Sequence, residues 1–294
     1  MDIVSSVVIG VVQGVTEFLP ISSTAHLKII PALLGWKEPS AASSAVIQLG
    51  TVAAVLVYFA KDLGAITKGF LRSLMPQKNT VVASGDAVAP DIDPRQTTEA
   101  RQGWAIILGT IPIIVVALLL KKFIENDFRS LYVIAGAQIV GALALYAADK
   151  LAPKTRTLDT ITVKDGILVG IAQCFALVPG MSRSGSTMTG GFLTGLNREA
   201  ATRFAFLLSV PATTLAGLFE LKEVFKNAPV APGEVQLSTP DLIIATLVSG
   251  LVGYASIAWL IKLLRTQDTL PFVVYRVLLG IGILLLLRQG ILTP

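Results

Sequence analysis

The chain of 294 residues carries 24 Lys and Arg and 19 Asp and Glu, while 53% of it is hydrophobic and its mean hydropathy is +0.72. This composition excludes a disordered chain and an average soluble enzyme. The single cysteine, Cys174, excludes an intrachain disulfide and a multi-thiolate zinc site, and the single histidine, His26, excludes a metal centre built from several histidines. The net charge of +5 is scattered between apolar segments, so we expect no nucleic-acid partner.

In chain order, the pattern is an interrupted apolar segment followed by three long spans, and then the same again. Residues 1–35 and 162–195 are broken by Pro20 and by Pro179-Gly180, where a lipid-facing helix would lose backbone hydrogen bonds, so we expect two re-entrant helical hairpins. The long apolar runs predict transmembrane helices at 40–60, 103–121, 130–149, 199–221, 241–263 and 270–288. Residues 62–102 are expected to contain a flexible polar loop. The predicted fold class is an all-α polytopic membrane protein with about six spans and two re-entrant hairpins.

The two halves of the chain share a weak motif. Gly10-x-x-Gln13 followed by Pro20-x-Ser22 resembles Gly170-x-x-Gln173 followed by Pro179-x-x-Ser182. Three spans per half is an odd number, so the second half would lie upside down relative to the first, as in many transporters. We therefore predict one integral membrane domain made of an inverted repeat, residues 1–150 and 160–294, whose hairpins meet near the membrane midplane.

Basic residues predict the orientation. They are more frequent in the loops at 61–102, 150–164, 196–203 and 262–268 than on the opposite side. By the positive-inside tendency, these loops are cytoplasmic and both termini face outward.

The first polar cluster runs from Gln13 to His26 inside an apolar hairpin. A charged side chain at membrane depth costs roughly 2.5–3.5 kcal/mol on insertion scales, so Glu17 is a functional candidate. Gln13 and Glu17 lie four residues apart on one helix face, where together they could hold a hydrated divalent cation or position a water.

A second helix is expected to begin after Pro20. Its free N–H groups, with the hydroxyls of Ser22, Ser23 and Thr24, would form an anion-binding N-terminus. Ser23 and His26 lie three residues apart, near enough for a proton to pass between them. The alternative is that Ser22 only caps the helix and that His26 is an interfacial residue.

The second polar cluster runs from Pro179 to Gly191 and sets Arg183 among hydroxyls and glycines. The planar guanidinium of arginine fits two phosphoryl oxygens, and glycines let the backbone approach a phosphate closely. The other predicted phosphate-binding residues here are Ser182, Ser184, Gly185 and Thr187. The alternative is close helix packing with a structural ion pair between Arg183 and Glu17. Arg276 could also reach a phosphate, but an arginine that snorkels or pairs within the bundle explains it equally well.

At these two clusters the sequence closely resembles the undecaprenyl pyrophosphate phosphatases of bacteria, the BacA-type family associated with bacitracin resistance. The resemblance rests on the [E/Q]xxxE pattern at Gln13–Glu17 followed by FLPISSTAH, on PGxSRSGxT at Pro179–Thr187, and on PFVVYR at Pro271–Arg276. It implies removal of the terminal phosphate from the C55 lipid diphosphate for cell-wall synthesis, in the bacterial inner membrane, with Mg²⁺ or Ca²⁺ and an active site open to the periplasm. Many relatives carry a first glutamate where this chain has Gln13, which leaves one charge fewer for a metal.

Our hypothesis from the sequence places the diphosphate between the hairpin tips, with Ser23 attacking, His26 relaying the proton, Glu17 binding the cation and Arg183 neutralising the phosphoryl group. His26 or water as the nucleophile stays open. The rival is a transporter or flippase for a polyprenyl phosphate, while acid phosphatases that need two histidines do not fit. Besides the polyprenyl diphosphate and membrane lipids, a homodimer is compatible with the sequence, which does not fix the oligomeric state.

Overall fold

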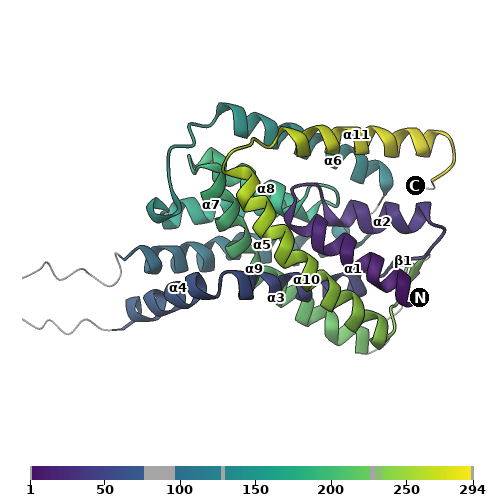
Figure 1. Ribbon diagram of the computed structural model, residues 1–294, viewed down its shortest axis with the longest axis horizontal. Coiled ribbons are helices and arrows are strands. Elements are labelled where there is room, and N and C mark those ends of the chain that lie inside the picture. Colours follow the sequence, from purple (N-terminus) through teal and green to yellow (C-terminus); the bar gives the residue numbers. More distant parts are fainter. Residues whose placement is uncertain (1, 76–96, 127–129, 226–229, 232, 293–294) are drawn as a thin grey trace, which may run out of the picture.

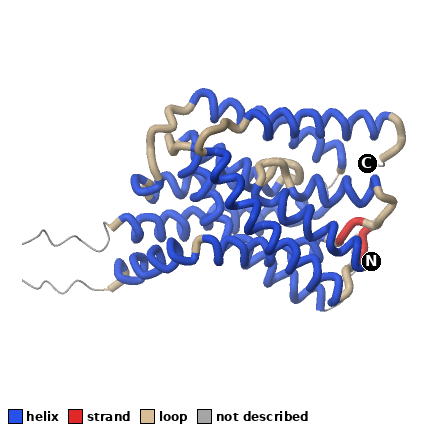
Figure 2. The backbone as a smooth tube through the Cα atoms, in the orientation of Figure 1, coloured by secondary structure: helices blue, strands red, loops and turns tan. Residues whose placement is uncertain are grey.

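The structure is a computed structural model that describes residues 2–75, 97–126, 130–225, 230–231 and 233–292. Helices form nearly all of that part of the chain, as Figures 1 and 2 show, and six of them are long and apolar enough to cross a membrane. The six are α3 (Ala41–Tyr58), α5 (Thr98–Asn126), α6 (Leu131–Leu151), α9 (Arg198–Phe225), α10 (Thr239–Leu264) and α11 (Leu270–Arg288). The all-α polytopic fold is confirmed, and each predicted span falls on one of these helices.

Two helical hairpins stand where the prolines interrupt the apolar runs. The first consists of α1 (Ile3–Phe18) and α2 (Ser23–Leu33), and the second of α7 (Val163–Cys174), the 3₁₀ turn η4 (Phe175–Leu177) and α8 (Arg183–Leu193). In both hairpins a serine with a left-handed backbone precedes the second helix: φ is 73° at Ser22 and 70° at Ser182. Residues other than glycine keep this conformation only where their surroundings fix it, so both tips are held by specific contacts.

Each hairpin is supported by a span from the other half of the chain. The helix α1 packs along α10, and α7 packs along α5. A Cβ atom at Gly14 would lie 2.8 Å from the carbonyl oxygen of Ser249 in α10, and a Cβ at Gly170 would overlap the carbonyl of Gly109 in α5. Small residues at these crossings let the backbones approach closely, as is usual between membrane helices.

The expected loop at 62–102 is shorter than predicted. After a break at Phe59 the chain continues as α4 (Ala60–Ser73), and α5 already begins at Thr98. The reason is apolar packing between α4 and α5, where the rings of Phe70 and Trp104 meet edge to face with centroids 5.0 Å apart. The rest of the predicted loop, residues 76–96, lies outside the described residues.

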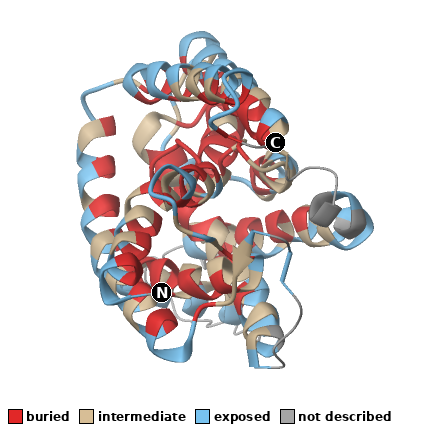
Figure 3. Ribbon diagram, turned by 90° about the vertical axis from the view of Figure 1, so that its right-hand side faces the viewer, coloured by how far each residue is buried: buried red, intermediate tan, exposed pale blue. Residues whose placement is uncertain are grey.

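The remaining elements join the helices at the two ends of the molecule. At the end that holds both termini (Figure 1), the strands β1 (Glu38–Pro39) and β2 (Glu234–Val235) pair in parallel. At the other end the short 3₁₀ helix η3 (Leu158–Thr160) precedes α7. Figure 3 shows that buried residues gather between the helices while the outer faces are exposed. Apolar side chains on those outer faces, such as Leu119 at 75% and Leu251 at 76% exposure, are suited to contact lipid.

Candidate active site

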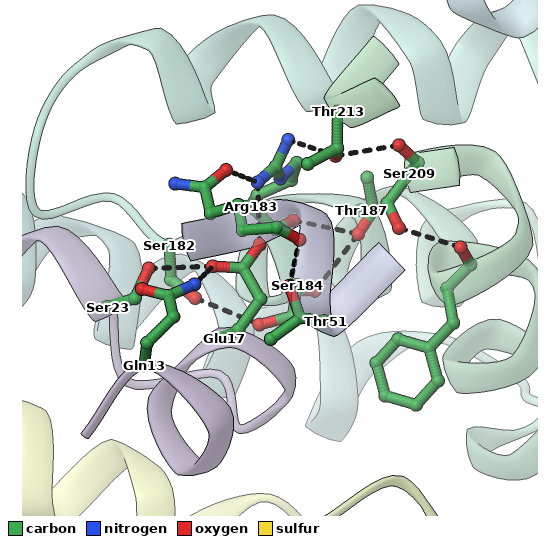
Figure 4. A network of polar contacts seen from close by, with 12 residues as sticks. Gln13, Glu17, Ser23, Thr51, Ser182, Arg183, Ser184, Thr187, Ser209 and Thr213 are labelled. Atoms are coloured by element: carbon green, nitrogen blue, oxygen red, sulfur yellow. Dashed lines mark hydrogen bonds and ion pairs between the residues drawn. The ribbon is translucent and has the colours of Figure 1, made fainter. Parts of the chain in front are cut away.

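The tips of the two hairpins bring together the two charged residues that the sequence singled out. Arg183, the first residue of α8, donates from Nη2 to Oε1 of Glu17 at the end of α1 over 2.6 Å (Figure 4). Their side chains are only 19% and 9% exposed. An ion pair this sheltered requires further hydrogen bonds to offset the desolvation of both charges.

Glu17 receives those hydrogen bonds on its second oxygen. Nε2 of Gln13 donates to Oε2 over 2.8 Å, and Oγ of Ser23 donates to the same oxygen over 2.9 Å (Figure 4). The structure therefore joins the predicted residues Gln13, Glu17, Ser23 and Arg183 in one network. The carboxylate of Glu17 contacts the other three.

Arg183 is also bound by two residues that sequence reasoning did not place in the site. Its Nη2 donates to Oε1 of Gln48 in α3 over 2.8 Å, and its Nη1 donates to Oγ1 of Thr213 in α9 over 2.5 Å. Gln48 was not among the predicted site residues, because a glutamine within an apolar span is more often an interhelical hydrogen-bond partner than a ligand. Its position as an amide within the uncharged run at 40–60 was the available signal, whereas Thr213 sits among other hydroxyl residues without any distinguishing pattern.

A cavity of about 180 Å³ opens beside this network. Of the predicted site residues, six line it: Glu17, Ser22, Ser23, Thr24, Ser182 and Arg183. A second cavity of about 310 Å³ adjoins it, because both are lined by Ser23, Thr24, Gln48, Ala176 and Leu177. The second cavity continues past Leu27 to Pro39 in β1, at the end of the molecule that holds the termini. The two cavities together offer a polar pocket followed by a path with more apolar walls.

Three predicted phosphate ligands lie in the second hairpin but do not line the 180 Å³ cavity. Oγ of Ser184 donates to the carbonyl of Leu19 over 3.0 Å, which ties the second tip to the first. The amide of Gly185 donates to Oγ of Ser182, and Oγ1 of Thr187 donates to the carbonyl of Arg183 over 2.8 Å. These groups therefore build the α8 N-terminus, with Ser182 as its cap.

His26 is bound differently from the expected pairing with Ser23. Its Nδ1 donates to the carbonyl of Ser22 over 2.7 Å, so in the neutral ring Nε2 accepts from the hydroxyl of Tyr275, also over 2.7 Å. The two rings are stacked with centroids 5.7 Å apart. Both ring nitrogens of His26 therefore have partners other than Ser23, whose hydroxyl donates to Glu17.

Arg276 is completely buried and lies outside the cavity lining. Its guanidinium donates to oxygens of the protein: Oε1 of Gln138 and the carbonyls of Pro20, Ala137, Gly180 and Met181. In place of the predicted contact with phosphate, the structure shows an arginine bonded to both hairpin tips.

The residues around Glu17 fit a divalent cation only in part. Oε1 of Gln13 is buried without a hydrogen-bond partner, which makes it a free oxygen ligand. Across the described parts of the chain, however, no group of three or more His, Cys, Asp or Glu side chains gathers. Because Mg²⁺ commonly binds through one or two carboxylates and the phosphates of the substrate, Gln13 and Glu17 suit a cation that the diphosphate helps to hold.

Comparison with known proteins agrees with this geometry. A family model described as "Bacitracin resistance protein BacA" matches residues 6–282. The chain belongs to the BacA family. It is 52% identical to an undecaprenyl-diphosphatase of Myxococcus xanthus (strain DK1622), over 100% of this chain and 92% of the relative. It is also 46% identical to an undecaprenyl-diphosphatase of Chlorobium limicola (strain DSM 245 / NBRC 103803 / 6330), over 99% of both chains. The BacA family model covers both hairpins and all six spans except the first residues of α1 and the end of α11.

Proposed function

We propose that this BacA-family protein is a membrane phosphatase that hydrolyses undecaprenyl diphosphate to undecaprenyl phosphate and inorganic phosphate. The observation that carries the proposal is the convergence of Ser23, Glu17 and Arg183 on one cavity at the hairpin tips. The names of the relatives supply the substrate. The reaction would recycle the lipid carrier for peptidoglycan synthesis and so confer resistance to bacitracin.

In this proposal the terminal phosphoryl group occupies the 180 Å³ cavity and the polyprenyl chain leaves along the adjoining cavity. Arg183 would exchange its bonds to Glu17 and Gln48 for two phosphoryl oxygens, because its planar fork matches their geometry. The hydroxyls of Ser22, Thr24 and Ser182, which line the same cavity, would donate to the remaining oxygens. Phosphoryl transfer needs mainly positioning and charge compensation, and this site supplies both.

Ser23 is the proposed nucleophile, and Glu17 is the proposed base. The Ser23 oxygen forms a bond to the terminal phosphorus as the bond from that phosphorus to the bridging oxygen breaks, and the hydroxyl proton passes to Glu17 over the existing hydrogen bond of 2.9 Å. Undecaprenyl phosphate leaves with the proton that Glu17 took from Ser23. A water then attacks the phosphorus and gives a proton to Glu17, the bond from phosphorus to the Ser23 oxygen breaks as inorganic phosphate forms, and Ser23 regains its proton from Glu17. Direct attack by water under Glu17 is the alternative.

A divalent cation, Mg²⁺ or Ca²⁺, is part of the proposal, with Gln13 and Glu17 as the protein's ligands. When bound, such a cation would neutralise the developing charge on the phosphates. The cavity extends toward the end of the molecule that holds both termini, which the basic residues predict to be outward. We therefore propose a bacterial inner-membrane location with a site open to the periplasm. Nothing in the cavity requires a second copy, so the homodimer stays a prediction.

Phosphate release from undecaprenyl diphosphate by the purified protein in detergent tests the proposal, with and without chelator. Ser23→Ala should lower kcat by several orders of magnitude, because it removes the nucleophile. A transporter or flippase needs no nucleophile and would still move its substrate after this change. The matched control is Ser256→Ala, because within the described parts of the chain this buried serine of α10 bonds only to its own helix. Full activity of Ser23→Ala would overturn the assignment of the nucleophile. Labelled phosphate found on wild-type protein after rapid quenching, but not on Ser23→Ala, would separate attack by Ser23 from attack by water.

A further inference from the structure

Arg276 lies where the two hairpin tips meet, and three of its bonds go to residues just before the two left-handed serines. Nη1 donates to the carbonyl of Pro20 over 3.4 Å, and Nη2 donates to the carbonyls of Gly180 over 3.1 Å and Met181 over 2.9 Å. Ser22 and Ser182 follow these carbonyls and are the N-cap residues of α2 and α8. One guanidinium therefore contacts both turns that aim Ser23 and Arg183 into the cavity.

The neighbours of Arg276 extend the same connection. Nε donates to Oε1 of Gln138 over 2.9 Å, and Nε2 of Gln138 donates to the carbonyl of Ile21 over 2.9 Å. The preceding residue, Tyr275, bonds to His26, whose other nitrogen bonds to the carbonyl of Ser22. The first tip is thus held by two consecutive residues of α11 and by one residue of α6.

The buried charge of Arg276 is surrounded by hydrogen-bond acceptors and not by an anion. The side chain is 0% exposed, and among the described residues no carboxylate forms an ion pair with it; only amide and carbonyl oxygens surround it. Burying a cation without an anion is costly, and lysine could not replace its bonds because an ammonium lacks the planar fork. A bundle that needed only packing would be served better by an apolar residue at this position.

Two glycines leave the room that the guanidinium occupies. A Cβ atom at Gly141 in α6 would overlap Nη2 of Arg276 and lie 3.0 Å from the carbonyl oxygen of Met181. A Cβ at Gly185 in α8 would lie 3.0 Å from Nη1. The fork is therefore enclosed by α6 and by the second hairpin as well as bonded to them.

From these contacts we propose that Arg276 is a positioning residue that holds the two hairpin tips in register, so that the nucleophile of one tip and the arginine of the other face the same phosphoryl group. The inference rests on the proposed phosphatase function for its consequence, but the clamp itself is a property of the fold. Arg276 acts through Ser23 and Arg183 and does not touch the substrate.

The test uses one substitution that displaces the guanidinium and one that replaces it with another cation. Gly141→Ala pushes on Nη2, and Arg276→Lys keeps the charge while losing the fork. The matched controls are Gly136→Ala in α6 and Gly282→Ala in α11, because a Cβ at either position meets no atom within 4 Å. The first readout is kcat and KM for undecaprenyl diphosphate. The second is the rate at which a maleimide labels Cys174, the chain's single cysteine. Cys174 ends α7, just before the second tip.

A misplacement of about 1 Å in a catalytic group can cost about 10²-fold in rate, so Gly141→Ala and Arg276→Lys should lower kcat by about that factor while KM changes by less. Both should speed the labelling of Cys174, and both controls should match wild type. An increase of KM at unchanged kcat would overturn the proposal, because it would mean that Arg276 binds phosphate directly. Wild-type kcat and labelling in folded Gly141→Ala would also overturn it. If wild type releases no phosphate, the proposed function fails, and the Cys174 rates still decide whether the clamp exists.

Discussion

At the scale of single residues, Glu17 is the group on which the site depends. One oxygen pairs with Arg183, and the other accepts from both Gln13 and Ser23. An acceptor that already holds the hydrogen of Ser23 is placed to take that proton during attack. The alternative of a purely structural ion pair explains the contact with Arg183 but gives no reason for a hydroxyl to face the same carboxylate beside a cavity.

The hydrogen bonds of His26 make a prediction that separates positioning from proton relay. The amide nitrogen of an asparagine can stand in for Nδ1 and that of a glutamine for Nε2. Because Nδ1 orients Ser22, His26→Asn should keep activity within about tenfold of wild type and His26→Gln should lose more, whereas a lost general acid or base would cost 10²–10⁴-fold in both. Measured kcat values for the two variants check this. Losses of about 10²–10⁴-fold in both variants would contradict positioning and would show that His26 relays a proton.

The unpartnered oxygen of Gln13 makes a prediction about the cation. Gln13→Glu adds a carboxylate beside Glu17, so a lower concentration of Mg²⁺ should support half-maximal phosphate release. Gln13→Met, which removes the oxygen, should raise that concentration. Titration of chelator-treated protein with Mg²⁺ gives both values. The same Mg²⁺ requirement in all three proteins would mean that Gln13 does not contact the cation.

At the scale of elements, the second hairpin begins at an anchored N-terminus. Asp165 and Thr162 form a capping box at the start of α7, and Nη2 of Arg156 pairs with Oδ2 of Asp165 over 2.7 Å. Burial opposes ionisation of Asp165, but the hydrogen bonds from Arg156 and Thr162 outweigh it and lower the pKa of the carboxyl. The carboxyl lies outside the six spans, at the far end of α7 from the hairpin tip.

This anchor should make the hairpin sensitive to acid. A carboxyl with a lowered folded-state pKa contributes stability that is complete above its unfolded pKa of about 3.9 and is lost as the pH falls through the folded value. Asp165→Asn should cost about 2 kcal/mol of unfolding free energy at pH 7 and remove that part of the acid dependence. Thermal midpoints in detergent at several pH values measure it, with the exposed Asp159→Asn as control. An unchanged midpoint for Asp165→Asn would contradict the anchor.

The sequence predicted these elements well where backbone chemistry decides them. Pro20 and Pro179-Gly180 break helices whatever surrounds them, and long apolar runs require helices in lipid, so the hairpins and spans are where they were predicted. What it missed depends on tertiary contacts. The partner of His26 is Tyr275, which is 249 residues away, and α4 is helical through its packing on α5. The sequence left Arg276 between a phosphate ligand and a partner within the bundle, because its type was visible and its surroundings were not.

At the scale of the whole molecule, the packing supports the proposed inverted repeat of 1–150 and 160–294. The first hairpin packs on α10 and the second on α5, which hold equivalent places in the two halves, while α3 packs on α9 and α6 on α11. The left-handed serines Ser22 and Ser182 match as well. Such an arrangement brings two hairpins from different halves to one site, which is why the chemistry is divided between α1–α2 and α8.

The orientation of the molecule can be tested with two exposed positions at its opposite ends. In a Cys174→Ser background, Gln289→Cys at the end of α11 should react with an impermeant maleimide in spheroplasts, since that end is predicted to face outward. Thr155→Cys, between α6 and η3, should react only after the membrane is opened. The reverse pattern would invert the topology and place the cavity on the cytoplasmic side.

The central claim is that the two hairpin tips form one phosphatase site, and a double-mutant cycle of Ser23→Ala and Arg183→Ala tests it most directly. The measurement is kcat for phosphate release from undecaprenyl diphosphate by wild type, both single variants and the double variant. Residues that act as a unit are strongly non-additive, so the double variant should be within about tenfold of the slower single variant. Losses that multiply in the double variant would show that the two residues act independently and would contradict a shared site.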